Sequence, residues 1–358
     1  MKLSELAHGR DNNFQLVRLA AAAFVVLFHS FALTGRWTQE PLWRIMPETN
    51  FGALGVKIFF FVSGFLVTQS WLSRQAVAPF VAARALRIYP ALVAATLLTI
   101  LLAGVSSEVP WSAFLADPQT IDYAWRVALG WDVVYRLPGA FPTNPFPHDV
   151  NGSLWTLPIE LRLYVAVLVA GFLGLLARRL SWLAIVVAMF AAFAWRPEWF
   201  PLSPNDAAVR QLAWLFALGS LAYVWRDRIP VSLAAAACCI ALVAWNPGGI
   251  PRGGLFPMLL AYVVLVIAYH PRLQWPAFNR TGDYSYGLYV YSFPVQQTLM
   301  QRFPGLEPAG LFACSLLLSL AVAAVSWHGL EAKALALKSR FDRPNPTPAR
   351  HDDAPDPA

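Results

Sequence analysis

The sequence predicts an all-α fold, a polytopic transmembrane helix bundle with about ten spans. Of its 358 residues, 58% are hydrophobic and only 13% are charged, and the mean hydropathy is +0.50. That charged share is about half the usual one, too little to coat several water-facing domains. Long apolar runs recur along the whole chain, and a helix needs about 20 such residues to cross the hydrocarbon core. The composition therefore argues against a soluble enzyme, a secreted domain and a disordered scaffold.

Each expected span is an apolar run bounded by polar or charged residues. Several runs are short, and the fifth and sixth could be re-entrant segments instead. Residues 1–340 are expected to form one membrane-embedded domain, and the Pro- and Asp-rich residues 341–358 a disordered cytoplasmic tail. The ten runs are 16–33, 56–71, 88–105, 155–177, 180–195, 207–225, 229–245, 255–268, 284–300 and 310–327.

The charge distribution predicts the orientation of the bundle. The formal net charge is +7, and most loop Lys and Arg residues fall in one alternating set of loops. This set includes both ends of the chain. Cytoplasmic loops of membrane proteins carry such an excess, so we expect both termini in the cytoplasm and no nucleic-acid partner.

The three cysteines predict neither a disulfide nor a metal site. Cys238, Cys239 and Cys314 all lie inside apolar runs. We expect them to be small packing residues.

The first span contains two ionisable residues, Arg18 and His29. They are eleven residues apart, which is about three helical turns and roughly 16 Å along the axis, so both should lie on one face. Ionisable residues inside a span are costly and are candidates for functional sites. Arg18 could instead be a snorkelling interface anchor, and His29 a core histidine bonded to a neighbouring helix.

Arg84 and Arg87 lie beside the third span with a spacing of three residues. On a helix they share a face, where two guanidinium groups can hold phosphates through paired hydrogen bonds. The alternative is an ordinary positive anchor at the cytoplasmic surface.

Glu160 falls near the start of the fourth span, after Pro158, which suits a helix start. If the helix enters from the outer side, this carboxylate could pair with His29 as an acid/base or orienting dyad. It could also be a simple interfacial carboxylate.

Two further segments carry structural expectations. Ser63-Gly64 is a small pair inside the second span and should allow close helix packing. The connection 106–153 is rich in Trp and Pro and should lie at the interface and cap a cavity, or else serve as a plain linker.

Five motifs occur in order along the chain: Arg18 with His29, GVKIFFFVSGFLVT, the Arg84 and Arg87 of RALRIYPA, SLWTLPIELRLY and TGDYSYGLYVYSFPV. Together they resemble the acyltransferase-3 family of integral membrane acyltransferases. The last motif departs from many relatives, which carry a His where this chain has Ser292. Any role of that second His is therefore absent here.

The resemblance implies a membrane enzyme that transfers an acyl group, most commonly acetyl, from acyl-CoA on the cytoplasmic side to a hydroxyl. The acceptor would be a sugar of a surface glycan or a lipid-linked sugar. Location in the bacterial inner (plasma) membrane, contact with membrane lipid, and envelope-polymer assembly proteins as partners are also implied.

The resemblance also implies residue roles. His29 would be the catalytic histidine, and Arg18, Arg84 and Arg87 would engage the donor. In this hypothesis His29 takes the acceptor proton and Glu160 orients the imidazole. A covalent acyl-histidine route stays open. No metal is expected.

Two other classes of function remain open at this stage. A transporter or flippase for a lipid-linked sugar or small metabolite would fit ten spans with buried charge. It should show paired spans broken by Gly or Pro, which we do not find. A non-catalytic assembly subunit for polymer export would tolerate replacement of Arg18 and His29.

Overall fold

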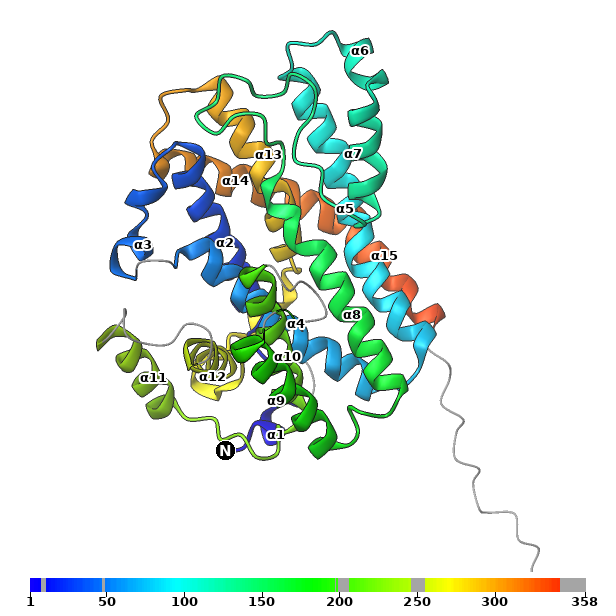
Figure 1. Ribbon diagram of the computed structural model, residues 1–358, viewed down its shortest axis with the longest axis vertical. Helices are drawn as coiled ribbons and strands as arrows, with labels where there is room; N and C mark the ends of the chain where they lie inside the picture. Colours follow the sequence, from blue (N-terminus) through cyan, green and yellow to red (C-terminus); the bar gives the residue numbers. More distant parts are fainter. Residues whose placement is uncertain (8–10, 47–48, 197, 199–205, 246–254, 342–358) are drawn as a thin grey trace, which may run out of the picture.

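A computed structural model of the chain describes residues 1–7, 11–46, 49–196, 198, 206–245 and 255–341. These residues form an all-helical bundle without a β-sheet (Figure 1). The predicted tail, apart from Phe341, lies outside the described residues.

The α-helices run in this order along the chain: α1 Leu3–Leu6, α2 Phe14–Leu33, α3 Pro41–Ile45, α4 Phe51–Leu72, α5 Val77–Val105, α6 Trp111–Ala116, α7 Pro118–Ala128, α8 Leu157–Phe172, α9 Arg179–Trp195, α10 Ala207–Val224, α11 Leu233–Trp245, α12 Leu255–Tyr269, α13 Ser285–Arg302, α14 Pro308–Ser326 and α15 Ala332–Ala336. Short 3₁₀ turns join them at η1 Trp37–Gln39, η2 Gly152–Thr156, η4 Pro271–Leu273, η5 Pro276–Arg280 and η7 Leu337–Arg340. A π-helical turn, η6 Trp327–Glu331, links α14 to α15.

Each of the ten predicted runs falls on a helix, but the described residues contain only six helical stretches long and apolar enough to cross a membrane. These stretches contain α2, α4, α5, α8, α10 and α14. The apolar helices α9, α11 and α12 are shorter, and α13 carries Gln296, Gln297 and several Tyr and Ser residues. The expected count of about ten spans is therefore not confirmed.

Helix α4 lies near the centre of the bundle and packs against α2 on one side and α10 on the other (Figure 1). A Cβ atom at Gly64 would lie 2.0 Å from the carbonyl oxygen of Phe216 in α10. One at Gly55 would lie 2.3 Å from the carbonyl oxygen of Ala21 in α2. Glycine thus lets both neighbouring backbones touch α4, which confirms the close packing expected at Gly64.

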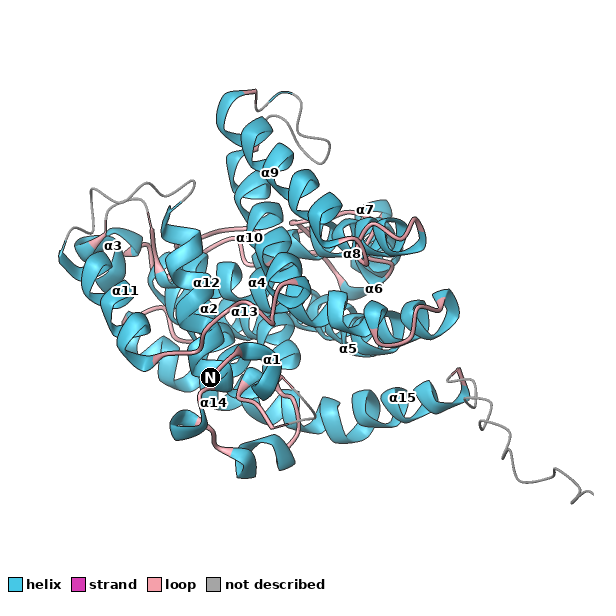
Figure 2. Ribbon diagram, turned by 90° about the horizontal axis from the view of Figure 1, so that it is seen from below, coloured by secondary structure: helices cyan, strands magenta, loops and turns pink. Residues whose placement is uncertain are grey.

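Helix α13 is the second buried helix, and it packs against α2, α5 and α14. Seen from below, α9 and α15 lie at opposite edges of the bundle, with α4 and α13 between them (Figure 2). This arrangement brings the start of α13 close to α2 and α5, which carry the predicted arginines.

The connection 106–153 is folded rather than a plain linker. Helices α6 and α7 pack against each other and against α5. Farther along, the side-chain amide of Asn144 donates to the backbone carbonyl of Gln297 (2.9 Å), and that of Asn151 donates to the carbonyl of Val290 (2.9 Å). This segment therefore covers part of α13.

The cysteines differ from expectation in their burial. None of the three is in a disulfide, and Cys238 and Cys314 are exposed on the exterior of the bundle. The prediction that they are small packing residues is wrong for these two, because apolar helix faces in this class of fold can turn outward toward lipid.

Candidate active site

A cavity of about 400 Å³ lies between α2, α4, α5, α8 and α13. It is lined by four of the five predicted site residues, which come from three helices and lie far apart in the sequence: Arg18, Arg84, Arg87 and Glu160. Arg74 and Lys338 also line it, while Thr156 and Tyr289 contribute from η2 and α13. The cavity therefore combines basic side chains, which suit an anionic ligand, with apolar lining residues such as Phe59, Phe60 and Leu66.

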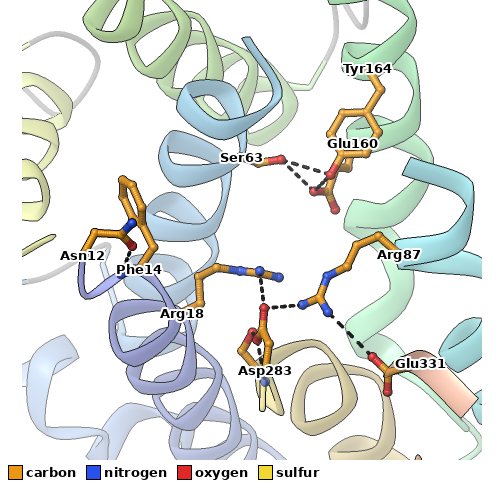
Figure 3. Close-up of polar contacts among 10 residues, drawn as sticks. Asn12, Phe14, Arg18, Ser63, Arg87, Glu160, Tyr164, Asp283 and Glu331 are labelled. Carbon is orange, nitrogen blue, oxygen red and sulfur yellow. Dashed lines mark hydrogen bonds and ion pairs between the residues drawn. The ribbon is translucent and has the colours of Figure 1, made fainter. Parts of the chain in front are cut away.

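Arg18 and Arg87 converge on one carboxylate, Asp283, which precedes α13. Nη1 of Arg18 lies 2.7 Å and Nη2 of Arg87 lies 2.6 Å from Oδ2 of Asp283 (Figure 3). The other oxygen, Oδ1, accepts hydrogen bonds from the backbone N–H (3.2 Å) and the hydroxyl of Ser285. The cluster ties α2, α5 and the start of α13 together.

The charge of Asp283 is stabilised by these partners. Burial alone would raise the pKa of this carboxyl, but the guanidinium groups of Arg18 and Arg87 and the bonds from Ser285 lower the pKa to about 2. Asp283 is thus ionised at neutral pH, and the three-residue cluster keeps a net positive charge.

A second carboxylate stands on the far side of Arg87. Oε2 of Glu331, in the π-helical turn, lies 3.9 Å from Nη1 of Arg87, and the Glu331 side chain is 1% exposed. Its Oε1 accepts a hydrogen bond from the hydroxyl of Ser326 (2.9 Å). The ring of Trp327 covers the Arg87 guanidinium at 5.6 Å, so Arg87 is held on several sides.

Arg84, one turn earlier on α5, has a different environment. Its guanidinium lies 5.9 Å from the centre of the Tyr164 ring. Its Nε atom is buried without a hydrogen-bond partner, and no ion pair joins Arg84 to any residue that the structure describes. The two arginines predicted as an equivalent pair are therefore not equivalent.

Glu160 is bonded inside the cavity wall. Its Oε1 accepts a hydrogen bond from the hydroxyl of Ser63 (2.9 Å) and another from the hydroxyl of Tyr164 (Figure 3). Within the described part of the chain, no hydrogen bond joins Glu160 to His29. The expected orienting dyad is therefore not formed, because Glu160 turns toward α4 and its own helix instead.

His29 lies outside the cavity, although it shares α2 with Arg18. Its ring packs edge-on against Phe293 of α13, with ring centres 5.0 Å apart. Its Nδ1 is buried and has no hydrogen-bond partner among the described residues. Phe293 is one helical turn beyond Tyr289, which lines the cavity.

Sequence reasoning missed Asp283, Glu331, Ser63 and Tyr164 as members of this site. Asp283 and Glu331 did carry a signal, because each is a carboxylate directly beside an apolar run. Such acids near a basic cluster are candidate partners. Ser63 was interpreted only as a packing residue, and its contact with Glu160 depends on how α8 docks on α4.

Comparison with known proteins identifies the family. The acyltransferase-3 family model, described as an acyltransferase domain, matches residues 11–328. The chain is 27% identical over 349 residues to an O-acetyl transferase of Shigella phage Sf6, covering 92% of this chain and 98% of that protein. It is 29% identical over 378 residues to nodulation protein 10 of Rhizobium leguminosarum bv. viciae, covering 94% of this chain and 96% of that protein.

No solved structure matches the chain. The family match spans most of the helical bundle, including the arginine cluster, Glu160 and His29. Together with the apolar helices, this coverage means that the chain is a membrane acyltransferase and belongs to the acyltransferase-3 family.

Proposed function

We propose that this protein is an integral membrane O-acyltransferase that moves an acetyl group from acetyl-CoA to a hydroxyl of a surface glycan or of a lipid-linked sugar. The observation that carries the proposal is the convergence of Arg18, Arg84 and Arg87 on one cavity of about 400 Å³. CoA is a phosphate-rich donor, and guanidinium groups bind phosphate through paired, charge-assisted hydrogen bonds. The name of the phage relative, an O-acetyl transferase, supports acetyl and oxygen as the transferred group and acceptor atom.

The proposed location is the bacterial inner membrane, with both termini in the cytoplasm. The excess of Lys and Arg on the side of the chain ends supports this orientation. The cavity is lined by Arg74, which follows α4, and by Lys338, near the end of the described chain. Both would then lie on the cytoplasmic side, where acetyl-CoA is available.

His29 remains the proposed catalytic residue. Its imidazole would take the proton of the acceptor hydroxyl as that oxygen attacks the thioester carbonyl, and the carbon–sulfur bond would break as CoA leaves. The same proton would then pass to the departing thiolate. Since neither His29 nor Phe293, which packs against it, lines the cavity, this route requires the cavity to open toward His29 when the donor binds.

Glu160 would act in the cavity rather than on His29. Its bonds to Ser63 and Tyr164 fix two hydroxyl groups on the wall that also carries Arg84. We therefore assign Glu160 to the donor end of the site, where its charge would keep Tyr164 and Ser63 in place.

Release of free CoA thiol from acetyl-CoA by purified protein tests the proposed function. Release that depends on an added glycan acceptor, together with loss of release in a correctly inserted His29→Ala variant, is expected. Arg162→Gln is a matched control, because Arg162 is exposed on α8 and does not line the cavity. Normal transfer by His29→Ala would contradict the catalytic assignment. No release with any acceptor would favour a transporter or flippase.

A further inference from the structure

The two arginines of α5 differ in whether their charge is already neutralised. Arg87 bonds to Asp283 at 2.6 Å and faces Glu331 at 3.9 Å, whereas Arg84 has no ion pair with any described residue. Both line the same cavity, one helical turn apart. On α5, an anionic ligand entering this cavity therefore meets one arginine that is held by protein carboxylates and one that has no ion pair with a described residue.

Both carboxylate oxygens of Asp283 already accept two hydrogen bonds each from groups of the protein. Oδ2 accepts from Arg18 and Arg87, and Oδ1 accepts from the backbone and side chain of Ser285. The side chains of Arg18, Arg87 and Asp283 are 20%, 15% and 10% exposed. Turning Arg18 or Arg87 toward a ligand would break a charge-assisted bond in a partly dry site, which is costly. This cluster therefore forms a fixed wall of the cavity.

Arg84 has the opposite character. Its Nε is buried and has no hydrogen-bond partner. The acidic residue among the described residues that line the cavity, Glu160, is bonded to Ser63 and Tyr164. A buried guanidinium N–H that lacks a hydrogen-bond partner is unfavourable until an acceptor supplies one. The ring of Tyr164 faces the Arg84 guanidinium at 5.9 Å and holds it at the cavity without neutralising it.

We infer that Arg84 is the cation that binds a phosphate group of the nucleotide thioester donor directly, and that Asp283 is a positioning residue that holds Arg18 and Arg87 at the cavity wall. These two roles rest on the proposed function, since they require a donor with phosphate groups. The inference assigns different roles to two arginines that sequence spacing treats alike.

Equilibrium binding to the detergent-solubilised full-length protein tests the inference without any need for an acceptor. Two probes are compared: CoA, and pantetheine, which has the same thiol arm but no phosphate. Loss of a hydrogen bond to a charged group corresponds to about 10- to 100-fold in affinity. Arg84→Gln should weaken CoA binding by that factor and leave pantetheine binding unchanged. Arg162→Gln, on an exposed position of α8, should change neither.

The Asp283→Asn variant separates a positioning carboxylate from a competing anion. A positioning role predicts weaker binding of CoA and unchanged binding of pantetheine, because Arg18 and Arg87 lose their fixed orientation. Tighter binding of CoA by Asp283→Asn would mean that Asp283 occupies the phosphate site, and would overturn this role. If Asp283→Asn does not fold, Asp283→Glu provides the second measurement, with the same expected loss of CoA affinity, because the longer side chain moves the carboxylate out of register with Arg18 and Arg87 while keeping its charge.

The outcomes for the wild-type protein separate this inference from the proposed function. If the wild-type protein binds CoA no better than pantetheine, the donor itself is wrong and the inference falls with it. If the wild-type protein prefers CoA but Arg84→Gln binds it equally well, while Arg87→Gln loses the preference, the proposed donor stands and the assignment to Arg84 is wrong.

Discussion

At the scale of single residues, the site contains more arginines than carboxylates that can pair with them. One carboxylate, Asp283, holds Arg18 and Arg87, and a second, Glu331, lies 3.9 Å from Arg87. Arg84 is left without an ion pair among the described residues. Sequence spacing placed Arg18, Arg84 and Arg87 on suitable helix faces, but which arginine would be neutralised depends on residues 196 to 265 positions away. No local pattern contains that information.

The shared carboxylate predicts a defined sensitivity to acid. The pKa of Asp283 is lowered by its cationic partners from an ordinary value of 3.8 to about 2 in the folded protein. The charged cluster therefore contributes stability at every pH above about 4, and this contribution is lost as the pH falls toward 2. A shift of this size corresponds to about 2 kcal/mol.

The comparison of the wild-type protein with Asp283→Asn by thermal unfolding in detergent checks this prediction. The wild-type protein should be the more stable at pH 6, and the difference should shrink steadily below pH 4. An unchanged difference down to pH 2 would show that the bonds of Asp283 do not depend on its charge.

At the scale of elements, apolar runs and small residues were sufficient to place the helices but not to predict their contacts. All ten expected runs are helical, since continuous apolar stretches of this length favour a buried helix. Helix α13 carries several Tyr, Ser and Gln residues, and the structure buries most of the helix. Its burial depends on α2, α5 and α14 packing around it, and on the segment that contains Asn144 and Asn151.

The close contact between α4 and α10 predicts that a larger residue at Gly64 destabilises the protein. A methyl group at Gly64 would lie 2.0 Å from the backbone oxygen of Phe216, which is too close for any rotamer change to relieve. Gly64→Ala should therefore push α10 away from α4 and destabilise the protein by about 1–3 kcal/mol. Since Ser63 is the preceding residue, the bond to Glu160 should also be disturbed, and transfer activity should fall.

Thermal unfolding and CoA thiol release measure the two effects of Gly64→Ala. Gly310→Ala is the matched control, because Gly310 is also helical and a methyl group there would meet only a side-chain atom of Leu306 at 3.4 Å. Equal melting temperatures for the two variants would contradict the packing argument.

At the scale of the whole molecule, the family and the helical class were predicted from the sequence, but the number of spans was not. Hydropathy suggested about ten, and six of the described helical stretches meet a strict criterion of length and apolar character. Hydropathy cannot decide the role of α13, because buried polar residues such as Gln296 and Gln297 bond inside the protein and lower its apolar score. The orientation of the bundle in the membrane can be tested directly at the segments between helices, because the side of the membrane on which they lie can be measured.

Thiol labelling of intact cells tests the proposed orientation of the bundle. In a background without Cys238, Cys239 and Cys314, single cysteines would replace exposed residues at Asp132, after α7, at Ser73, after α4, and at Ser339, after α15. A reagent that cannot cross the membrane should label Asp132→Cys in intact cells, but Ser73→Cys and Ser339→Cys only after permeabilisation. This is because the basic cavity end beside Arg74 and Lys338 should face the cytoplasmic acetyl-CoA. Labelling of Ser73→Cys from outside would place the arginine cluster on the side without acetyl-CoA, and the proposed donor could not reach it.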